Sequence, residues 1–225
     1  MKNFLSIDQG TTSSRSIIFD AELNLVTDAQ EEYDLTYPED GWVELEPKKI
    51  IETVTNTLNK VLSADIGLEA CGITNQRETT IVWSKSTGEA IYPGIVWQDR
   101  RTHEYCSYLK SNGHEPVIKE KTGLLLDPYF SATKIKWILD NVDGAREKAN
   151  KGELLFGTVD SYLIYMLSKE KNHFTDVTNA SRTLLFNIKS MEWDDELLEL
   201  FEIPKTMMPE VLSCDGDFGN LKIND

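Results

Sequence analysis

The amino-terminal quarter of the chain orders its extended and helical patterns in a way that restricts the fold. Strand-like runs at 4–7, 15–20 and 30–37 follow one another, and glycine-rich or polar turns separate them. Connections this short favour an antiparallel meander. Pro47 then opens an amphipathic helix, because the N–H that proline lacks is not needed at the first helical position. The apolar face of this helix is expected to consist of Ile50, Ile51, Val54, Leu58, Val61 and Leu62.

Strand and helix patterns alternate through the rest of the chain. The strand-like runs are 69–74, 79–83, 91–97 and 154–156, and the helical faces are 135–142 and 159–167. An antiparallel opening followed by this alternation predicts an α/β fold, with a mixed β-sheet and helices packed on it. The tail at 212–225 has no strong apolar periodicity, so we expect no stable element there.

Charge and composition exclude several classes of partner. The chain has 23 basic and 38 acidic residues, and its net charge of −15 disfavours both nucleic acid and an anionic membrane. The longest apolar stretch, 162–167, is far too short to cross a bilayer, and the chain opens without an apolar leader. Three widely spaced cysteines are typical of a reducing compartment. We therefore expect a cytoplasmic protein without an integral membrane segment.

The hydroxyl-rich turn at 8–15, Asp-Gln-Gly-Thr-Thr-Ser-Ser-Arg, is the first candidate for chemistry. Gly10 lets a phosphate approach the backbone, the Thr and Ser residues offer donors, and Arg15 adds a fixed cation. Asp8 would repel phosphate unless it faces a magnesium ion or its bound water. A plain Ser/Thr-rich turn with Asp8 bonded to its amides is the competing interpretation. The P-loop and Rossmann glycine patterns are both absent from the sequence.

Two further pairs of residues suit a ligand made of hydroxyl groups and carbon. Arg77 and Glu78 offer a forked donor and an acceptor, but adjacent residues reach one ligand only where the backbone departs from a regular strand. Trp97 can shield the carbon side of a polyol while the hydroxyl of Tyr129 binds its polar edge. A surface Arg–Glu pair without consequence and two core aromatic residues are the competing interpretations.

Seven blocks that run through nearly the whole chain are informative as a set. They are residues 8–15, 38–43, 75–80, 97–101, 127–130, 152–158 and 178–183. Together they resemble the FGGY carbohydrate kinase family. Asn-Gln-Arg-Glu-Thr-Thr at 75–80 and Asp-Pro-Tyr-Phe at 127–130 are similar to its glycerol-phosphorylating members rather than to its pentose kinases. The resemblance implies that residues 1–225 form an actin-like, ribonuclease-H-like domain.

The resemblance also implies a role for each candidate residue. The residues expected at the phosphates of ATP are Thr11, Thr12, Ser13 and Arg15, and the residue expected at Mg²⁺ is Asp8. The residues expected at glycerol are Arg77, Glu78 and Tyr129 for its hydroxyls and Trp97 for its carbons. The implied reaction consumes ATP and glycerol and yields ADP and sn-glycerol 3-phosphate.

One part of the family pattern is missing from the sequence. Family members have a second domain that binds most of the nucleotide, and their catalytic aspartate stands in a Gly-Asp-Gln-Gln motif that is not found here. Asp217 stands in a different context, so we expect no catalytic residue within the chain and place the base beyond Asp225. The chain would then be an inactive N-terminal portion of a dimeric or tetrameric kinase. A stand-alone glycerol-binding or regulatory module is the alternative, and the acidic charge disfavours a nuclease on the same scaffold.

Overall fold

The residues that the computed structural model describes, 2–62 and 66–222, divide into two units. The first unit draws on Met1–Leu35 and Leu45–Gln76, and the second draws on Thr36–Glu44 and Arg77–Asp225. The chain therefore passes between the units at 35/36, at 44/45 and at 76/77. Within the described residues, the first unit contains one four-stranded sheet and one helix, and the second contains several two-stranded sheets and the remaining helices.

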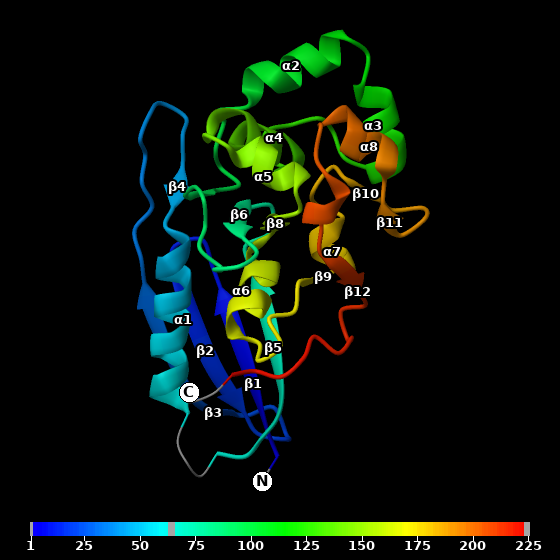
Figure 1. The fold of residues 1–225 in the computed structure, drawn as a ribbon. Helices are drawn as coiled ribbons and strands as arrows, with labels where there is room; N and C mark the ends of the chain where they lie inside the picture. Colours follow the sequence, from blue (N-terminus) through cyan, green and yellow to red (C-terminus); the bar gives the residue numbers. More distant parts are fainter. Residues whose placement is uncertain (1, 63–65, 223–225) are drawn as a thin grey trace. The chain divides into compact units, whose positions relative to one another are not determined.

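The first unit is a four-stranded sheet with one helix along it (Figure 1). Its strands are β1 (Asn3–Gln9), β2 (Ser13–Phe19), β3 (Leu25–Glu32) and β5 (Leu68–Asn75), in the order β3-β2-β1-β5. The pairs β1–β2 and β2–β3 are antiparallel, which confirms the predicted meander. Strand β5 runs parallel to β1, so the sheet is mixed, as expected.

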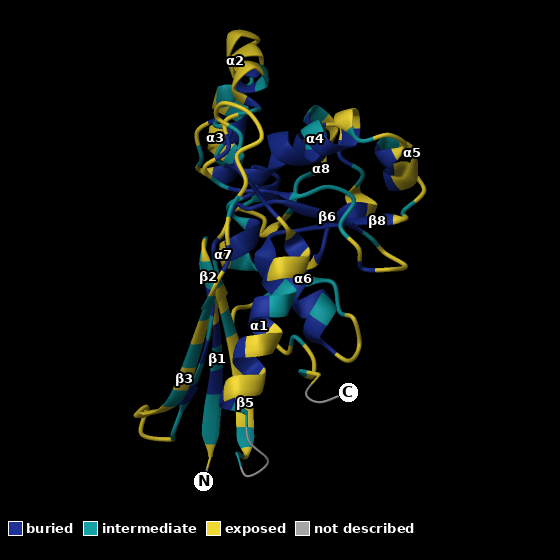
Figure 2. Cartoon of the chain, turned by 90° about the vertical axis from the view of Figure 1, so that its left-hand side faces the viewer, coloured by how far each residue is buried: buried dark blue, intermediate teal, exposed yellow. Residues whose placement is uncertain are grey.

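The helix α1 (Pro47–Val61) begins at the predicted proline. Its buried residues are Pro47, Ile50, Thr53, Val54, Thr57, Leu58 and Val61. The hydroxyl of Ser14 lies 2.8 Å from that of Thr53, so a buried polar group of β2 has a partner on the helix. Ile51 and Leu62, which we placed on the same apolar face, are only partly buried. Thr53 and Thr57 belong to the buried face instead. Figure 2 shows buried stretches of α1 in dark blue and exposed ones in yellow.

The third strand begins earlier than the sequence pattern predicted. We expected it at 30–37, whereas β3 covers Leu25–Glu32. The difference arises in the preceding turn, where the side chain of Asp20 accepts hydrogen bonds from the amides of Glu22 and Asn24, at 3.0 and 2.8 Å. This tight turn returns the chain to the sheet after only a few residues.

The second unit is built around a buried antiparallel pair of strands, β6 (Ile81–Ser84) and β8 (Leu154–Gly157). These confirm the predicted strands, and α4 (Ser131–Asn141) and α6 (Val159–Leu167) confirm the predicted helices. The predicted strand at 91–97 is mostly wrong, because only β7 (Gly94–Ile95) is regular there. The largest fully buried apolar side chains of the second unit are Trp83, Phe156, Phe186 and Phe201.

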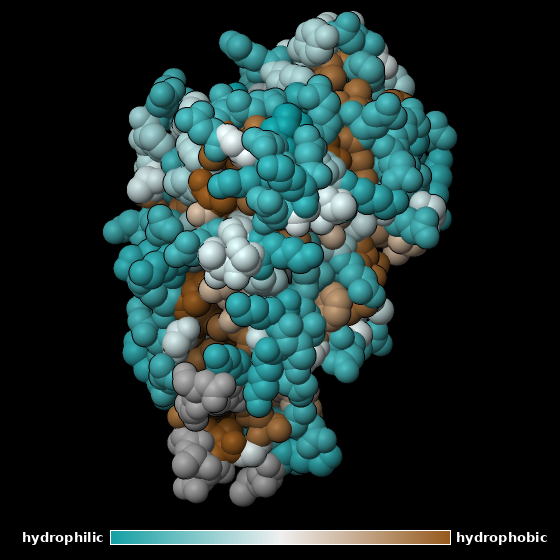
Figure 3. Space-filling view, in the orientation of Figure 1, coloured by the Kyte–Doolittle hydropathy of each residue, from teal (hydrophilic) through white to brown (hydrophobic). Residues whose placement is uncertain are grey.

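The remaining elements are short. The helices are α2 (His103–Ser111), α3 (Glu115–Thr122), α5 (Ala145–Asn150), α7 (Val177–Ala180), α8 (Asp195–Leu200) and the 3₁₀ turn η1 (Lys205–Met207). The strands are β4 (Glu44–Leu45), β9 (Phe174–Asp176), β10 (Phe186–Asn187), β11 (Glu192–Trp193) and β12 (Glu210–Leu212). From 213 to 222 the chain forms no helix or extended strand, as the tail pattern predicted, and 223–225 lie outside the described residues. Hydrophilic residues cover most of the face shown in Figure 3.

Candidate active site

The hairpin between β1 and β2 carries the hydroxyl-rich turn at its tip, within the first unit. Half-buried Thr11 and exposed Thr12 form the connection, and the amide of Gly10 donates to the carbonyl of Ser13 with an N–O distance of 2.8 Å. Gly10 has no left-handed φ, and a Cβ added there would lie 3.4 Å from the Ser13 oxygen. The turn itself thus tolerates a side chain. The absence of a side chain leaves the backbone here open to the approach of a phosphate that the sequence analysis expects.

Three buried side chains hold the carbonyl oxygen of Gly10. Gln9 Nε2 and the Tyr33 hydroxyl donate to it at 2.7 Å, and Gln76 Nε2 donates at 3.1 Å. Burial raises the pKa of Tyr33 to about 12, so its hydroxyl keeps the proton that it donates. The C=O and N–H of a trans peptide point in opposite directions. Because the three side chains hold the Gly10 carbonyl, the Thr11 N–H of the same peptide group points away from these side chains. The sequence analysis did not predict this network.

Asp8 and Arg15 stand opposite each other in the β1–β2 register, so both side chains lie on the same face of the sheet. Arg15 Nη2 pairs with Asp28 Oδ2 at 2.7 Å, and both side chains are partly exposed. Such a surface pair contributes only about 0.2–1 kcal/mol, so a phosphate can replace Asp28 as the partner. Exposed Asp8, with the Thr hydroxyls of the turn, supplies the hard oxygen donors that Mg²⁺ accepts beside water and phosphate.

The backbone is irregular at Glu78, which is the departure from a regular strand that Arg77 and Glu78 would need in order to reach one ligand. Glu78 has a left-handed φ of 56°, which costs a non-glycine residue about 1–3 kcal/mol. Three donors on its carbonyl oxygen hold this conformation: Lys134 Nζ at 3.1 Å, and the hydroxyls of Thr80 and Ser131 at 3.3 and 3.4 Å. Arg77, in contrast, is exposed, and it makes no ion pair with any residue in 2–62 or 66–222.

Three of the four residues predicted to bind the polyol belong to one cluster in the second unit. The rings of Trp97 and Tyr129, both half-buried, lie with centroids 5.5 Å apart. Arg182 Nε donates to Glu78 Oε1 at 2.7 Å, and the Arg182 guanidinium lies 4.9 Å from the ring centroid of Phe130 and 5.9 Å from that of Tyr129. A carboxylate and an aromatic wall are thus brought together. Arg182 stands in the 178–183 block, but its pairing with Glu78 was not predicted, because the two residues are 104 positions apart.

A buried charged cluster fixes the chain just after Trp97. The side chain of Arg101 is fully buried, and its Nη2 contacts both Glu44 and Asp99 at 2.8 Å. The Arg101 guanidinium also lies 3.9 Å from the ring centroid of Trp42, a cation–π contact. The same Asp99 oxygen, Oδ2, also accepts a hydrogen bond from the amide of Val43, at 2.6 Å. Separating these buried charges would leave them unpaired, so the ion pairs anchor the chain at Asp99 and Arg101, just after Trp97.

The phosphate set and the polyol set lie in different units. Asp8, Thr11, Thr12, Ser13 and Arg15 belong to the first unit, and Arg77, Glu78, Trp97 and Tyr129 belong to the second. The structure therefore establishes the internal geometry of each set. The peptide bond between Gln76 and Arg77 joins the network at Gly10 to the irregular segment at Glu78 along the chain.

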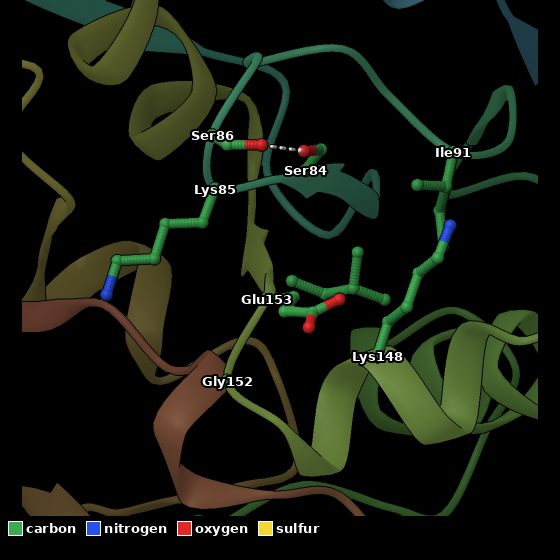
Figure 4. A pocket seen from close by; sticks show the side chains of 8 residues that line it. Ser84, Lys85, Ser86, Ile91, Lys148, Gly152 and Glu153 are labelled. Atoms are coloured by element: carbon green, nitrogen blue, oxygen red, sulfur yellow. Dashed lines mark hydrogen bonds between the residues drawn. The ribbon is translucent and has the colours of Figure 1, made fainter.

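A cavity of about 420 Å³ in the second unit contains none of these residues (Figure 4). It lies at the Ser84–Leu154 end of the β6–β8 pair, whereas Glu78 precedes the opposite end of β6. Its lining consists of Ser84, Lys85, Ser86, Ile91, Lys148, Gly152, Glu153 and Leu154. Charges of both signs line this cavity, so it shows no clear preference for a ligand.

The described residues contain neither a ready-made metal cluster nor a membrane-spanning helix. Among residues 2–62 and 66–222, no cluster of three or more His, Cys, Asp or Glu side chains could hold a metal ion. Asp8 therefore belongs to no carboxylate-rich metal cluster, and a magnesium ion held there would take most of its ligands from water and phosphate. In the same part of the chain, every helix is too short or too polar to cross a membrane.

Comparison with known proteins identifies relatives of the whole chain. It is 56% identical over 226 residues to the glycerol kinase of Alteromonas mediterranea, covering 98% of this chain and 46% of the relative. It is 58% identical over 223 residues to the glycerol kinase of Oceanobacillus iheyensis, covering 97% of this chain and 45% of the relative. The chain thus spans less than half the length of these curated relatives.

Solved structures and a family model agree with that similarity. The glycerol kinase of Plasmodium falciparum, solved with ADP, matches with a TM-score of 0.94 at 36% identity, covering 99% of this chain and 45% of that one. The gluconate kinase of Lactobacillus acidophilus matches with a TM-score of 0.87 at 24% identity, which shows the shared fold. These neighbours confirm the predicted actin-like α/β fold. The model of the FGGY family of carbohydrate kinases, N-terminal domain, matches residues 3–225, and the chain belongs to that family.

Proposed function

We propose that this chain is the N-terminal portion of a glycerol kinase, which uses ATP to convert glycerol into sn-glycerol 3-phosphate. The cluster of Glu78, Trp97 and Tyr129 carries this proposal, because a carboxylate beside an aromatic wall suits a small molecule with hydroxyls on one side and carbon on the other. The names of the relatives at 56% and 58% identity support the same substrate.

Each set of residues has a distinct task in this proposal. The residues that bind the phosphates of ATP are Thr11, Thr12, Ser13 and Arg15. The residues that bind glycerol are Arg77, Glu78 and Tyr129 through its hydroxyls and Trp97 through its carbons. Asp8 holds Mg²⁺, directly or through water, and the ion neutralises phosphate charge when bound. The chain's own residues thereby orient the alcohol and exclude water from its carbon side.

The general base comes from the part of the kinase beyond this chain, as does most of the nucleotide site. Loss of a general base alone costs about 10²–10⁴-fold in rate, so the isolated 225-residue chain should be close to inactive. We further propose a cytoplasmic location, where ATP is available, and a homo-oligomeric complete enzyme, a dimer or tetramer that sedimentation velocity would detect.

A coupled assay of ADP release tests this function directly. The chain alone, a separately prepared C-terminal half, their mixture and the complete protein are each assayed with glycerol and Mg-ATP. We expect turnover by the complete protein, recovery in the mixture and almost none with the chain alone. Normal turnover by the chain alone contradicts the proposal. Glycerol binding by the chain, with no turnover in the complete protein, favours a regulatory module instead.

A further inference from the structure

An ion pair links the candidate polyol site to a segment far away in the sequence. Arg182 Nε donates to Glu78 Oε1 at 2.7 Å, and the Glu78 side chain is 5% exposed while that of Arg182 is 28% exposed. The Arg182 guanidinium also lies near the rings of Phe130 and Tyr129. It is therefore held by a carboxylate and by aromatic rings at once, which restricts its rotamers more than an ordinary surface pair would.

A buried lysine, Lys134, bonds to the backbone of Glu78. Lys134 is fully buried, and its Nζ donates to the backbone oxygens of Glu78 and Tyr129, at 3.1 and 2.8 Å. The backbone of Glu78 is thus fixed by Lys134, and its carboxylate is fixed by Arg182. Because Lys134 bonds to both loops, it also sets the spacing between Glu78 and Tyr129.

We propose that Arg182 is a positioning residue of the polyol site, which holds Glu78 Oε1 so that Oε2 faces a substrate hydroxyl. The inference rests on the proposed function, because it assumes that Glu78 binds the alcohol. A carboxylate has two oxygens, and fixing one of them determines the direction of the other. Lysine would not replace Arg182 fully, since an ammonium lacks the planar fork and stacks poorly on aromatic rings.

The test uses the complete kinase, with steady-state kinetics for glycerol and ATP and with thermal unfolding. In Arg182→Ala we expect the glycerol KM to rise about tenfold or more, because a Glu78 carboxylate that is no longer held in place binds the substrate hydroxyl less well. The ATP KM should stay within about twofold, because Arg182 acts through a residue that touches only the alcohol. Arg182→Lys should be intermediate. Guanidinium ion at millimolar concentration should partly restore glycerol binding to Arg182→Ala, because the replaced side chain is partly exposed.

Arg146→Ala is the matched control. Arg146 also pairs with a carboxylate, that of Asp140, and its side chain is 32% exposed, close to the value for Arg182. Its removal should leave both KM values unchanged. The inference is overturned if Arg182→Ala keeps the wild-type glycerol KM, or if it raises both KM values equally and guanidinium restores neither. A wild-type enzyme that does not phosphorylate glycerol overturns the proposed function and this inference with it, whereas an active wild type with a normal Arg182 variant overturns the inference alone.

Discussion

Replacing Gly10 by alanine should show whether glycine is needed at this position for phosphate binding or for the stability of the fold. A Cβ at this position would lie 3.4 Å from the carbonyl oxygen of Ser13 and 3.9 Å from its hydroxyl, so it has no severe clash to relieve. The free energy of unfolding should change by less than about 1 kcal/mol, and alanine at an unstrained site can even stabilise by about 0.4–1 kcal/mol.

The same methyl group should interfere with phosphate. A charge-assisted hydrogen bond from a backbone N–H requires a donor–acceptor distance of about 2.7–2.9 Å, and a Cβ beside the turn obstructs that approach. Loss of one such bond, about 1.5–3 kcal/mol, corresponds to a rise of about tenfold or more in the ATP KM of the complete kinase. The glycerol KM should change much less, because the polyol residues lie on other segments.

Gly157→Ala is the contrasting variant, in which the added methyl group should reduce stability. A Cβ there would lie 2.5 Å from Ser161 Cβ and 2.8 Å from Trp83 Cη2, at the buried end of β8. Overpacking of this kind costs about 1–3 kcal/mol, which lowers the melting temperature by about 2–4 °C per kcal/mol in a chain of this size. Thermal unfolding and steady-state kinetics of both variants show whether each glycine serves ATP binding or stability. Normal ATP kinetics in Gly10→Ala, or a loss of stability as large as that of Gly157→Ala, would refute the reasoning.

Three further perturbations test other parts of the site. Arg77→Ala and Glu78→Ala should raise the glycerol KM of the complete kinase more than the ATP KM, and unchanged glycerol saturation in both variants would remove them from the site. Tyr33→Phe removes the buried hydroxyl that bonds to Gly10, so urea denaturation should show a loss of about 1–3 kcal/mol; a smaller loss would mean that water replaces the hydroxyl. Burial lowers the pKa of Lys134 to about 7, so the unfolded chain binds more protons between pH 7 and about 10.4. The lysine's contribution to stability should therefore rise with pH in that window, by up to about 1.4 kcal/mol per pH unit, and Lys134→Met should flatten the profile; equal slopes in both proteins would contradict a lowered pKa.

Local sequence patterns predicted the elements that short-range signals define. The meander and α1 follow from alternation, turn residues and a proline at the first helical position. The four-residue helix α7 has no periodicity to detect, and Asp176 caps it through a side-chain bond to the amide of Asn179. For similar reasons the predicted strand at 91–97 shrinks to Gly94–Ile95, where pairing decides the conformation rather than composition.

The site shows the same division between local and distant information. An irregular backbone at Glu78 could be predicted, because two adjacent residues can serve one ligand only in that way, and its φ of 56° confirms it. The partners that hold Glu78 could not be predicted. Lys134 and Arg182 reach it across 56 and 104 residues, and nothing in their own neighbourhoods indicates the contact.

The three crossings of the chain between the units limit how the protein can be divided. A fragment that ends at Gln76 would carry residues 36–44 without the partners that anchor them, since Val43 and Glu44 bond to Asp99 and Arg101, 56 and 57 residues further on. A fragment that begins at Arg77 would deprive the guanidinium of Arg101 of one of its two carboxylates. During synthesis on the ribosome, residues 36–44 therefore lack these partners until the segment that contains Asp99 and Arg101 has left the exit tunnel.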